Sequence, residues 1–131
     1  MLHSMSVKDY MSGDILCFSP DGNVLDAIHQ LVVHHVSGAP VVDHLGNIVG
    51  ILSEKDCMRV ALTASYHEEA GGKVEEYMTR DVKTIEADAS LVEVAELFMQ
   101  TPYRRFPVVE DTRRVGQISR HDVLKALEYL W

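Results

Sequence analysis

The chain has 131 residues, 47% hydrophobic and 24% charged, which is the size and composition of a folded globular domain and excludes disordered or fibrous proteins. No apolar run approaches the roughly 20 residues that span a bilayer, and the first residues lack the features of a secretion signal. The net charge of −8 argues against non-specific nucleic-acid binding, for which Lys and Arg must replace counterions. We therefore expect a cytoplasmic protein that binds neither membranes nor nucleic acid.

The first half of the chain predicts an extended segment, a helix, a hairpin and a second helix, in that order. After the extended residues 15–18, the first helix begins at Asn23, a good N-cap that an acid, Asp26, follows three residues later. The hairpin strands cover residues 39–42 and 48–52, and the second helix begins at Ser53. Helical spacing selects the residues expected to face the core: Leu25, Ile28, Leu31 and Val32 in the first helix, and Cys57, Met58, Val60 and Ala61 in the second.

The second half predicts the same elements again. An extended segment at 82–85 precedes a helix that begins at Ser90, and a hairpin of residues 106–109 and 115–118 precedes a helix that begins at Ser119. Residues 63–73, which include Gly71 and Gly72, are predicted to form an exposed connector. The core residues expected in these helices are Leu91, Val94, Ala95 and Phe98, and Val123, Leu124, Ala126 and Leu127.

The two halves are copies of one unit. A shift of 67 residues aligns identical residues in order, and after the loss of one residue in the hairpin turn the shift becomes 66. Because a unit this small rarely folds stably alone, we expect an α/β (α+β) fold of two β-α-β-β-α subdomains that face each other. The identical pairs are Val7/Val74, Tyr10/Tyr77, Met11/Met78, Asp14/Asp81, Asp21/Asp88, Pro40/Pro107, Val41/Val108, Val42/Val109, Val49/Val115, Gly50/Gly116, Ser53/Ser119 and Asp56/Asp122.

One repeated string is suited to binding an anion or a nucleotide. Gly-x-x-Ser-x-x-Asp occupies residues 50–56 and 116–122, where a strand ends and a helix begins. Unpaired amide groups and the positive end of the helix dipole point out of such a place, and the aspartate can accept both hydroxyls of a ribose. The alternative is a capping box, in which Ser and Asp only cap the helix. Capping alone leaves the repeated glycine unexplained.

These strings, in order and twice, resemble a tandem pair of CBS domains, the regulatory module of the cystathionine β-synthase type that is often called a Bateman module. The matching strings are VKDYM and VEEYM at residues 7–11 and 74–78, PVVD and PVVE at 40–43 and 107–110, and Gly-x-x-Ser-x-x-Asp. The resemblance divides the chain into a first CBS domain (1–62), a connector (63–73) and a second CBS domain (74–131) that form one globular module. It implies clefts related by a pseudo-two-fold axis, in which many members bind AMP, ADP, ATP or S-adenosylmethionine, and it implies no required cofactor.

Carried over by position, the resemblance places a ribose at Asp56 and Asp122, with Ser53 and Ser119 near the ribose or a phosphate. The resemblance also implies that the base lies beside Ile15 and Cys17 in the first copy, and beside Val82 and Thr84 in the second. The residues that it implies for the lining of the pocket ahead of the strand are Ser37, Gly38, Ala39 and Pro40 in the first copy, and Arg104, Arg105, Phe106 and Pro107 in the second.

The two copies differ in charge around these positions. Where the second copy has Arg104, Arg105, Arg120 and His121, the first has Ser37, Gly38, Glu54 and Lys55. Because a phosphate needs compensating cations, we expect the second copy to be the stronger nucleotide site, although Arg104 and Arg105 would also suit a solvated turn. Both copies keep Ser and Asp, so two occupied sites stay open.

The remaining reactive residues favour structural roles. Adjacent His34 and His35 diverge on a helix, which favours a helix end over a metal site. Cys17 and Cys57 are expected to be free, largely buried core thiols. No Walker loop, paired catalytic acids, Ser/His/Asp order or zinc spacing occurs, so we do not expect an enzyme.

Three functions stay open. The first is a sensor module, in which an adenine nucleotide shifts the angle between copies or chains and thereby acts on a regulated partner protein. The second is an interaction scaffold of the same fold with empty clefts, and the third is a metal-dependent hydrolase that uses Asp56 or Asp122. We expect a homodimer that pairs exposed apolar helix faces, with candidates in the helices before Pro40 and Pro107 and in the stripe of Leu124, Leu127, Leu130 and Trp131.

Overall fold

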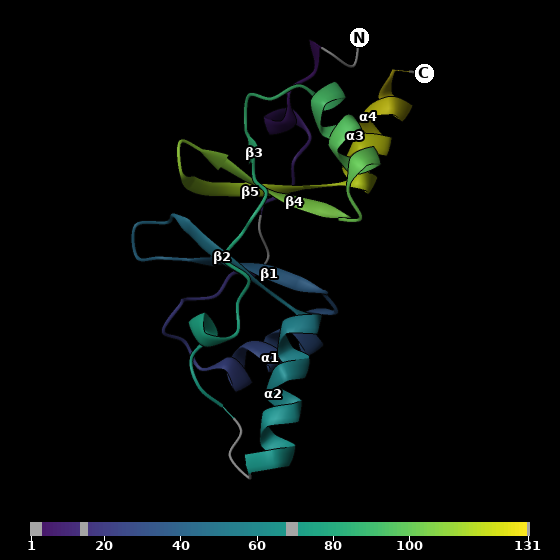
Figure 1. Ribbon diagram of the computed structural model, residues 1–131. Coiled ribbons are helices and arrows are strands. Elements are labelled where there is room, and N and C mark those ends of the chain that lie inside the picture. The colour runs from purple at the N-terminus through teal and green to yellow at the C-terminus, as the bar shows by residue number, and fades with distance from the viewer. Residues whose placement is uncertain (1–3, 14–15, 68–70, 131) are drawn as a thin grey trace. The chain divides into compact units, whose positions relative to one another are not determined.

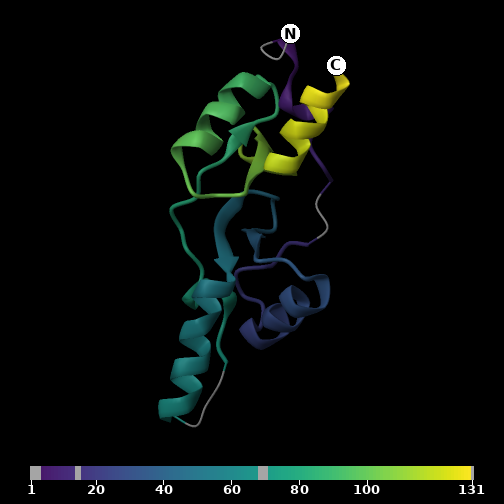
Figure 2. The same cartoon turned by 90° about the vertical axis from the view of Figure 1, so that its right-hand side faces the viewer.

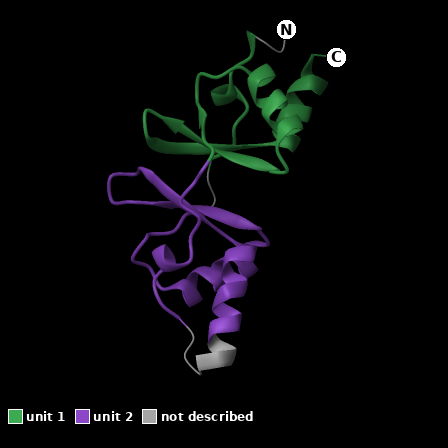
Figure 3. Cartoon of the chain, viewed as in Figure 1, with its two compact units in different colours: residues 1–14, 83–131 green, residues 15–82 purple. Residues whose placement is uncertain are grey.

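A computed structural model describes residues 4–13, 16–67 and 71–130, apart from the side chains of residues 64–67. The chain divides into two compact units (Figure 3): unit 1 comprises residues 1–14 and 83–131, and unit 2 comprises residues 15–82. The units differ from the two sequence repeats in their leading segments, the residues that precede the first strand of each repeat. The leading segment of the first repeat (residues 1–14) belongs to unit 1, and that of the second repeat (residues 74–82) belongs to unit 2.

Unit 2 is built around the first hairpin. Its strands are antiparallel, with Gly38 opposite Ser53, and Phe18 adds a parallel bridge to Val41 in place of a third strand. The two helices contact each other and lie side by side against this sheet (Figures 1 and 2). The elements are α1 (Val24–His34), β1 (Gly38–Val42), β2 (Ile48–Ser53), α2 (Glu54–His67) and the 3-10 helix η3 (Val74–Glu76).

Unit 1 repeats this arrangement with a fuller sheet. A short strand pairs in parallel with the first hairpin strand, Ile85 opposite Val108, and the hairpin strands are antiparallel, Arg105 opposite Ser119. The elements are the 3-10 helix η2 (Val7–Asp9), β3 (Ile85–Glu86), α3 (Leu91–Gln100), β4 (Arg105–Glu110), β5 (Arg113–Ser119) and α4 (Arg120–Tyr129). The predicted mixed α and β fold class is confirmed. The predicted β-α-β-β-α order is present in unit 1, whereas in unit 2 the first strand is reduced to the bridge between Phe18 and Val41.

The segment that leads each repeat completes the core of the unit formed by the other repeat. Val7 is fully buried in the unit 1 core, and its N–H donates to the Ala89 carbonyl at 2.9 Å. Val74 is 1% exposed in the unit 2 core, and its N–H donates to the Gly22 carbonyl at 2.9 Å. Each unit therefore depends on residues from both repeats.

The helices begin where the sequence predicts. Asn23 accepts a hydrogen bond from the Leu25 N–H at 2.8 Å, and Ser90 accepts one from the Glu93 N–H at 3.2 Å. These N-caps satisfy N–H groups of the first turn and thereby fix the residue at which each helix begins.

The faces that the helices bury are narrower than predicted. In α3, Leu91, Val94 and Phe98 are buried as expected. In α1 the buried residues are Val24, Ala27 and Leu31, whereas Leu25 is 42% and Val32 is 66% exposed, so that part of the prediction is wrong. Met58, Ala61 and Leu124 are also exposed and Leu127 is half-buried, while Cys57, Val60, Val123 and Ala126 are buried. A short helix against one small sheet buries a single i, i+3, i+7 stripe, not a wide face.

The connections differ from the prediction in length. α2 continues to His67, so the first part of the expected connector is helical, and residues 68–70 lie outside the described residues. The second hairpin turns through Asp111 and Thr112 between longer strands, whereas the first turns through residues 43–47. Among the described residues, no helix is long and apolar enough to cross a membrane.

Candidate ligand site

The end of each hairpin meets the start of the following helix in the same way in both units. In unit 1, Arg105 lies opposite Ser119, and the Arg120 N–H donates to the Arg104 carbonyl at 3.1 Å. In unit 2, Gly38 lies opposite Ser53, and the Glu54 N–H donates to the Ser37 carbonyl at 2.8 Å. The structure therefore brings the predicted residues of each string together with those at the start of β1 or β4.

The extended segments bring further predicted residues to the same strands. The pairing of Phe18 with Val41 sets Cys17 beside Pro40 in register, and the pairing of Ile85 with Val108 does the same for Thr84 and Pro107. Val82 belongs to unit 2 and is not placed relative to the unit 1 residues, and Ile15 lies outside the described residues.

Two of the predicted residues direct their side chains into the cores. Ala39 is 5% and Phe106 is 1% exposed, and the Phe106 ring centroid lies 4.8 Å from that of Phe98. Tyr103, which the sequence analysis did not single out, is 53% exposed and contacts Phe106 edge to face beside Arg104. A lone aromatic in a loop gave no periodic signal by which to find it.

Ser and Asp form a capping box at both helix starts. In unit 1, the Ser119 N–H donates to Asp122 Oδ2 at 2.9 Å, and the Asp122 N–H donates to Ser119 Oγ at 3.2 Å. In unit 2, the Ser53 N–H and Oγ both donate to Asp56 Oδ2 at 2.9 Å, and the Asp56 N–H donates to Ser53 Oγ. The capping interpretation is confirmed, and it fixes both carboxylates in place.

The repeated glycine has a structural explanation. A Cβ at Gly116 would lie 2.6 Å from the Ser12 carbonyl oxygen, and a Cβ at Gly50 would lie 2.6 Å from Met78 Sδ and 2.9 Å from the Thr79 carbonyl oxygen. Ser12 pairs with Gln117, next to Gly116, and Thr79 pairs with Ile51, next to Gly50. The glycine therefore makes room for the leading segment of the other repeat, and it is no argument for a ligand.

The two aspartates differ in what remains available on their carboxylates. Asp122 is 5% exposed, and among the described residues its Oδ1 accepts no hydrogen bond. Asp56 is half-buried, and its Oδ1 accepts a hydrogen bond from Thr79 Oγ1 at 3.1 Å. A buried carboxylate with an unused oxygen is the stronger candidate acceptor for a ligand.

Positive charge gathers at the unit 1 site. Arg104, Arg105, Arg120 and His121 are all exposed, and within residues 4–13, 16–67 and 71–130 no carboxylate pairs with any of the three arginines. The equivalent region of unit 2 carries Ser37, Gly38, Glu54 and Lys55. The charge asymmetry predicted from the sequence therefore lies on residues that the hairpin and helix bring together.

The cysteines and the histidine pair have separate surroundings. Cys57 is buried, and burial raises the pKa of its thiol, with the Asp56 and Glu54 carboxylates acting in the same direction. Cys17 is exposed, so its prediction as a core residue is wrong; it lies in an extended segment outside the helix stripes. His34 ends α1 and His35 caps it, which confirms the helix-end prediction. The described residues contain no group of three or more His, Cys, Asp or Glu that could hold a metal.

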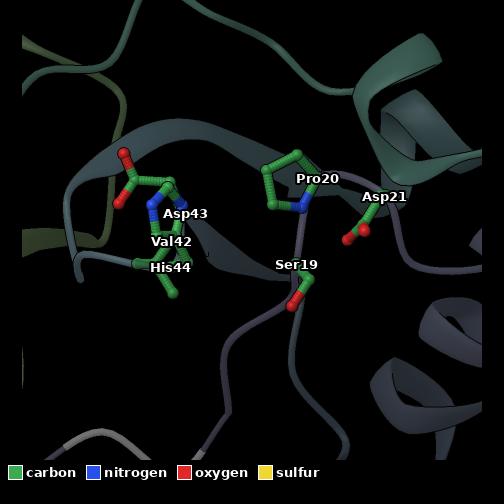
Figure 4. Close-up of a pocket in the computed structure, with 6 residues that line it drawn as sticks. All are labelled: Ser19, Pro20, Asp21, Val42, Asp43 and His44. Carbon is green, nitrogen blue, oxygen red and sulfur yellow. The ribbon is translucent and has the colours of Figure 1, made fainter.

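A separate pocket of about 280 Å³ lies within unit 2 (Figure 4), where residues 19–21 face residues 42–44. The Asp43 carboxylate on its wall already accepts hydrogen bonds from the Leu45 and Asn47 N–H groups, each at 2.9 Å, and these bonds lower its pKa, the one from Asn47 most. None of the predicted ligand-binding residues lines this pocket, which comprises Ser19, Pro20, Asp21, Val42, Asp43 and His44.

Comparison with known proteins identifies the repeats. The CBS domain family matches residues 7–63 and 74–129. CBSX2, solved in complex with AMP, covers 96% of this chain and 98% of its own at 28% identity with a TM-score of 0.82, and the CBS-pair protein CBSX2 from Arabidopsis thaliana gives the same TM-score at 26% identity. A CBS domain pair solved with 5′-methylthioadenosine and S-adenosyl-L-methionine gives a TM-score of 0.74 at 26% identity, with 97% and 98% of the two chains covered.

The chain also matches parts of longer proteins. The inosine-5′-monophosphate dehydrogenase of Methanocaldococcus jannaschii is 33% identical over 117 residues, which are 88% of this chain and 22% of that protein. The protein MJ1225 of the same organism is 28% identical over 95% of this chain and 44% of its own length. The chain thus spans less than half the length of these curated relatives.

Proposed function

The chain belongs to the CBS domain family as a tandem pair, or Bateman module, and we propose that it is a non-catalytic regulatory module that binds an adenosine-containing ligand. Asp122 carries this proposal: its buried carboxylate is held by the Ser119 N–H, and Oδ1 is left to accept the hydroxyls of a ribose. The ligands of two structural relatives support it, since AMP, 5′-methylthioadenosine and S-adenosyl-L-methionine all contain an adenosine, whereas only AMP has a phosphate. The ligand would regulate a partner protein or an attached domain through the two units.

The arginines of unit 1 favour a phosphorylated ligand. Arg104, Arg105 and Arg120 meet where β4 begins and α4 starts, and α4 adds its positive dipole end. Charge-assisted bonds to a phosphate stabilise AMP there, whereas 5′-methylthioadenosine lacks the phosphate and the sulfonium of S-adenosylmethionine is repelled. We therefore expect unit 1 to bind AMP, ADP or ATP more tightly than the other two.

Isothermal titration of the full chain with these five compounds tests the proposal. Asp122→Asn keeps an oxygen for the Ser119 N–H but replaces the second carboxylate oxygen with an amide donor, so the cap stays and the ribose acceptor is lost. We expect at least tenfold weaker AMP binding at the tighter site, while Asp88→Asn, an exposed control, leaves it unchanged.

The arginines are tested separately, because Arg104→Ala and Arg105→Ala should weaken AMP binding without weakening that of 5′-methylthioadenosine. If the wild-type chain binds none of the five compounds, the scaffold function replaces this proposal. If any compound is hydrolysed during the titration, the hydrolase function replaces this proposal.

We also propose that a second copy of the chain covers the outer helix faces. Two pairs of equivalent residues are exposed on them: Val32 (66%) and Met99 (87%) on α1 and α3, and Met58 (58%) and Leu124 (60%) on α2 and α4. A patch that occurs twice by repeat suits a two-fold symmetric dimer. Of the predicted terminal stripe, Leu124 is exposed, Leu127 and Leu130 are half-buried, and Trp131 lies outside the described residues.

Sedimentation velocity of the double variant Met58→Glu/Leu124→Glu tests the dimer, which should dissociate because two charges per chain enter an apolar interface. Leu45→Glu, on an exposed hairpin turn, is the matched control and should leave the sedimentation coefficient unchanged. A wild-type chain that sediments as a monomer at every concentration would refute the dimer.

A further inference from the structure

The first-copy aspartate is already engaged by a residue from the second repeat. Thr79 Oγ1 lies 3.1 Å from Asp56 Oδ1 and 3.3 Å from Oδ2, and its hydroxyl donates to that carboxylate. The backbone holds it there, because Thr79 and Ile51 exchange two N–H to carbonyl bonds of 2.8 Å. Met78, directly before it, is 8% exposed in the unit 2 core.

The donors on the two carboxylates differ in number. A carboxylate offers about four acceptor positions. Asp56 receives three donors, the Ser53 N–H, the Ser53 hydroxyl and the Thr79 hydroxyl. Asp122 receives the Ser119 N–H alone among the described residues. A ribose brings two hydroxyl donors, so Asp122 can accept both, whereas Asp56 can accept both only by losing one of its present partners.

The equivalent residue in unit 1 makes no such contact. Ser12 and Gln117 exchange backbone hydrogen bonds of 2.9 and 3.0 Å, as Thr79 and Ile51 do. The Ser12 hydroxyl, however, makes no hydrogen bond to Asp122 in the part of the chain that the structure describes. The backbone arrangement is therefore shared, and the bond to the carboxylate belongs to unit 2.

We propose that the Thr79 hydroxyl competes with a ribose for Asp56 and so keeps the first-copy ligand site weaker than the second. This inference rests on the proposed function, since it concerns the same class of ligand. Binding at Asp56 has to replace one hydrogen bond, and the exposure of the Thr79 hydroxyl reduces the strength of this bond to that of an ordinary intramolecular hydrogen bond, below the usual value for a charged acceptor. We expect the hydroxyl to weaken adenosine binding at Asp56 by about threefold to tenfold.

The test reads both sites in one molecule. The full chain is labelled with ¹⁵N and titrated with AMP, and the amide signals of Asp56 and Asp122 report the two dissociation constants separately. Thr79→Val keeps the β-branched shape and the backbone bridge but removes the hydroxyl. Thr79→Ser restores a hydroxyl, and Ser12→Ala is the matched control in unit 1.

The expected result is that Thr79→Val lowers the AMP dissociation constant at Asp56 by about threefold to tenfold and leaves that at Asp122 unchanged. Thr79→Ser and Ser12→Ala should both behave as the wild type. In a parallel titration, the preference of the Asp56 site for AMP over 2′-deoxy-AMP should be larger in Thr79→Val than in the wild type. The freed carboxylate position can accept the 2′-hydroxyl, which 2′-deoxy-AMP lacks.

Two results would overturn the inference and they are distinguishable. If AMP shifts the Asp122 signals but Thr79→Val leaves binding at Asp56 unchanged or weaker, Thr79 does not compete with the ligand, and the proposed function stands. If neither set of signals moves with AMP or S-adenosylmethionine in any variant, the proposed function fails and this inference fails with it.

Discussion

Gly116→Ala should destabilise unit 1 because an alanine methyl group has no room beside the leading segment of the first repeat. The added Cβ would lie 2.6 Å from the Ser12 carbonyl oxygen and 3.0 Å from Met11 Sδ. The methionine can move, but the carbonyl belongs to a backbone that exchanges hydrogen bonds of 2.9 and 3.0 Å with Gln117. Losing both bonds costs about 1–3 kcal/mol at roughly 0.5–1.5 kcal/mol each. The lower unfolded-state entropy of alanine returns about 0.4–1 kcal/mol, which leaves a net loss of about 1.5 kcal/mol.

Urea unfolding measures this loss, and in a thermal scan it corresponds to a fall in Tm of about 3–6 °C. Amide hydrogen exchange localises it, since the protection of Ser12 and Gln117 should fall before that of the other strands. Gly13→Ala is the matched control, because a Cβ there meets nothing within 4 Å. If Gly116→Ala unfolds at the same urea concentration as Gly13→Ala, the close approach does not explain the repeated glycine.

Three further predictions concern single sites. His35 caps α1 with φ at 54°, so His35→Gly should raise the free energy of unfolding by about 1 kcal/mol in urea, and an unchanged midpoint would contradict this. Iodoacetamide should modify Cys17 rapidly and Cys57 slowly, because Cys57 is buried and burial raises its thiol pKa; mass spectrometry should find no fast modification in Cys17→Ser. The hydrogen bond from the Asn47 N–H lowers the pKa of the Asp43 carboxyl, so this bond stabilises the fold above the ordinary aspartate pKa and the stabilisation is lost as pH falls through the lowered pKa. The difference in urea midpoint between the wild type and Asp43→Ala should therefore disappear at acid pH. A difference that stays constant with pH would refute this prediction.

The sequence predicts the elements of this fold well because each has a local cause. Asn23 and Ser90 cap their helices through their own side chains, and the hairpins follow from β-branched runs on either side of a turn. The buried face of α1 is harder to predict from the sequence, since several overlapping apolar stripes fit helical spacing. The repeat itself contains the better answer: a shift of 67 maps Leu91, Val94 and Phe98 onto Val24, Ala27 and Leu31, which are the buried residues.

The candidate site likewise has a part that the sequence predicts and a part that it does not. The string of Ser53 and Asp56, with its equivalent in the second copy, is visible in the sequence because strand end, cap and carboxylate are neighbours in the chain. The contact of Thr79 with Asp56 spans 23 residues and a change of repeat, so no local pattern reports it. The role of the glycine was hidden for the same reason, since what fills the space beside it comes from elsewhere in the chain.

Sequence identity between repeats makes this long-range pairing ambiguous in principle. Val7 and Val74 are equivalent, as are Met11 and Met78, so each leading segment carries the apolar residues that either core needs. The structure selects the exchanged pairing, with Val7 and Val74 buried in the cores of the opposite repeats. Because Thr79 belongs to the second repeat by sequence but to unit 2 by packing, a substitution in that leading segment acts on the site of the first repeat. The effects of substitutions on ligand binding should therefore group by unit and not by repeat, which is the pattern that the Thr79 and Ser12 variants distinguish.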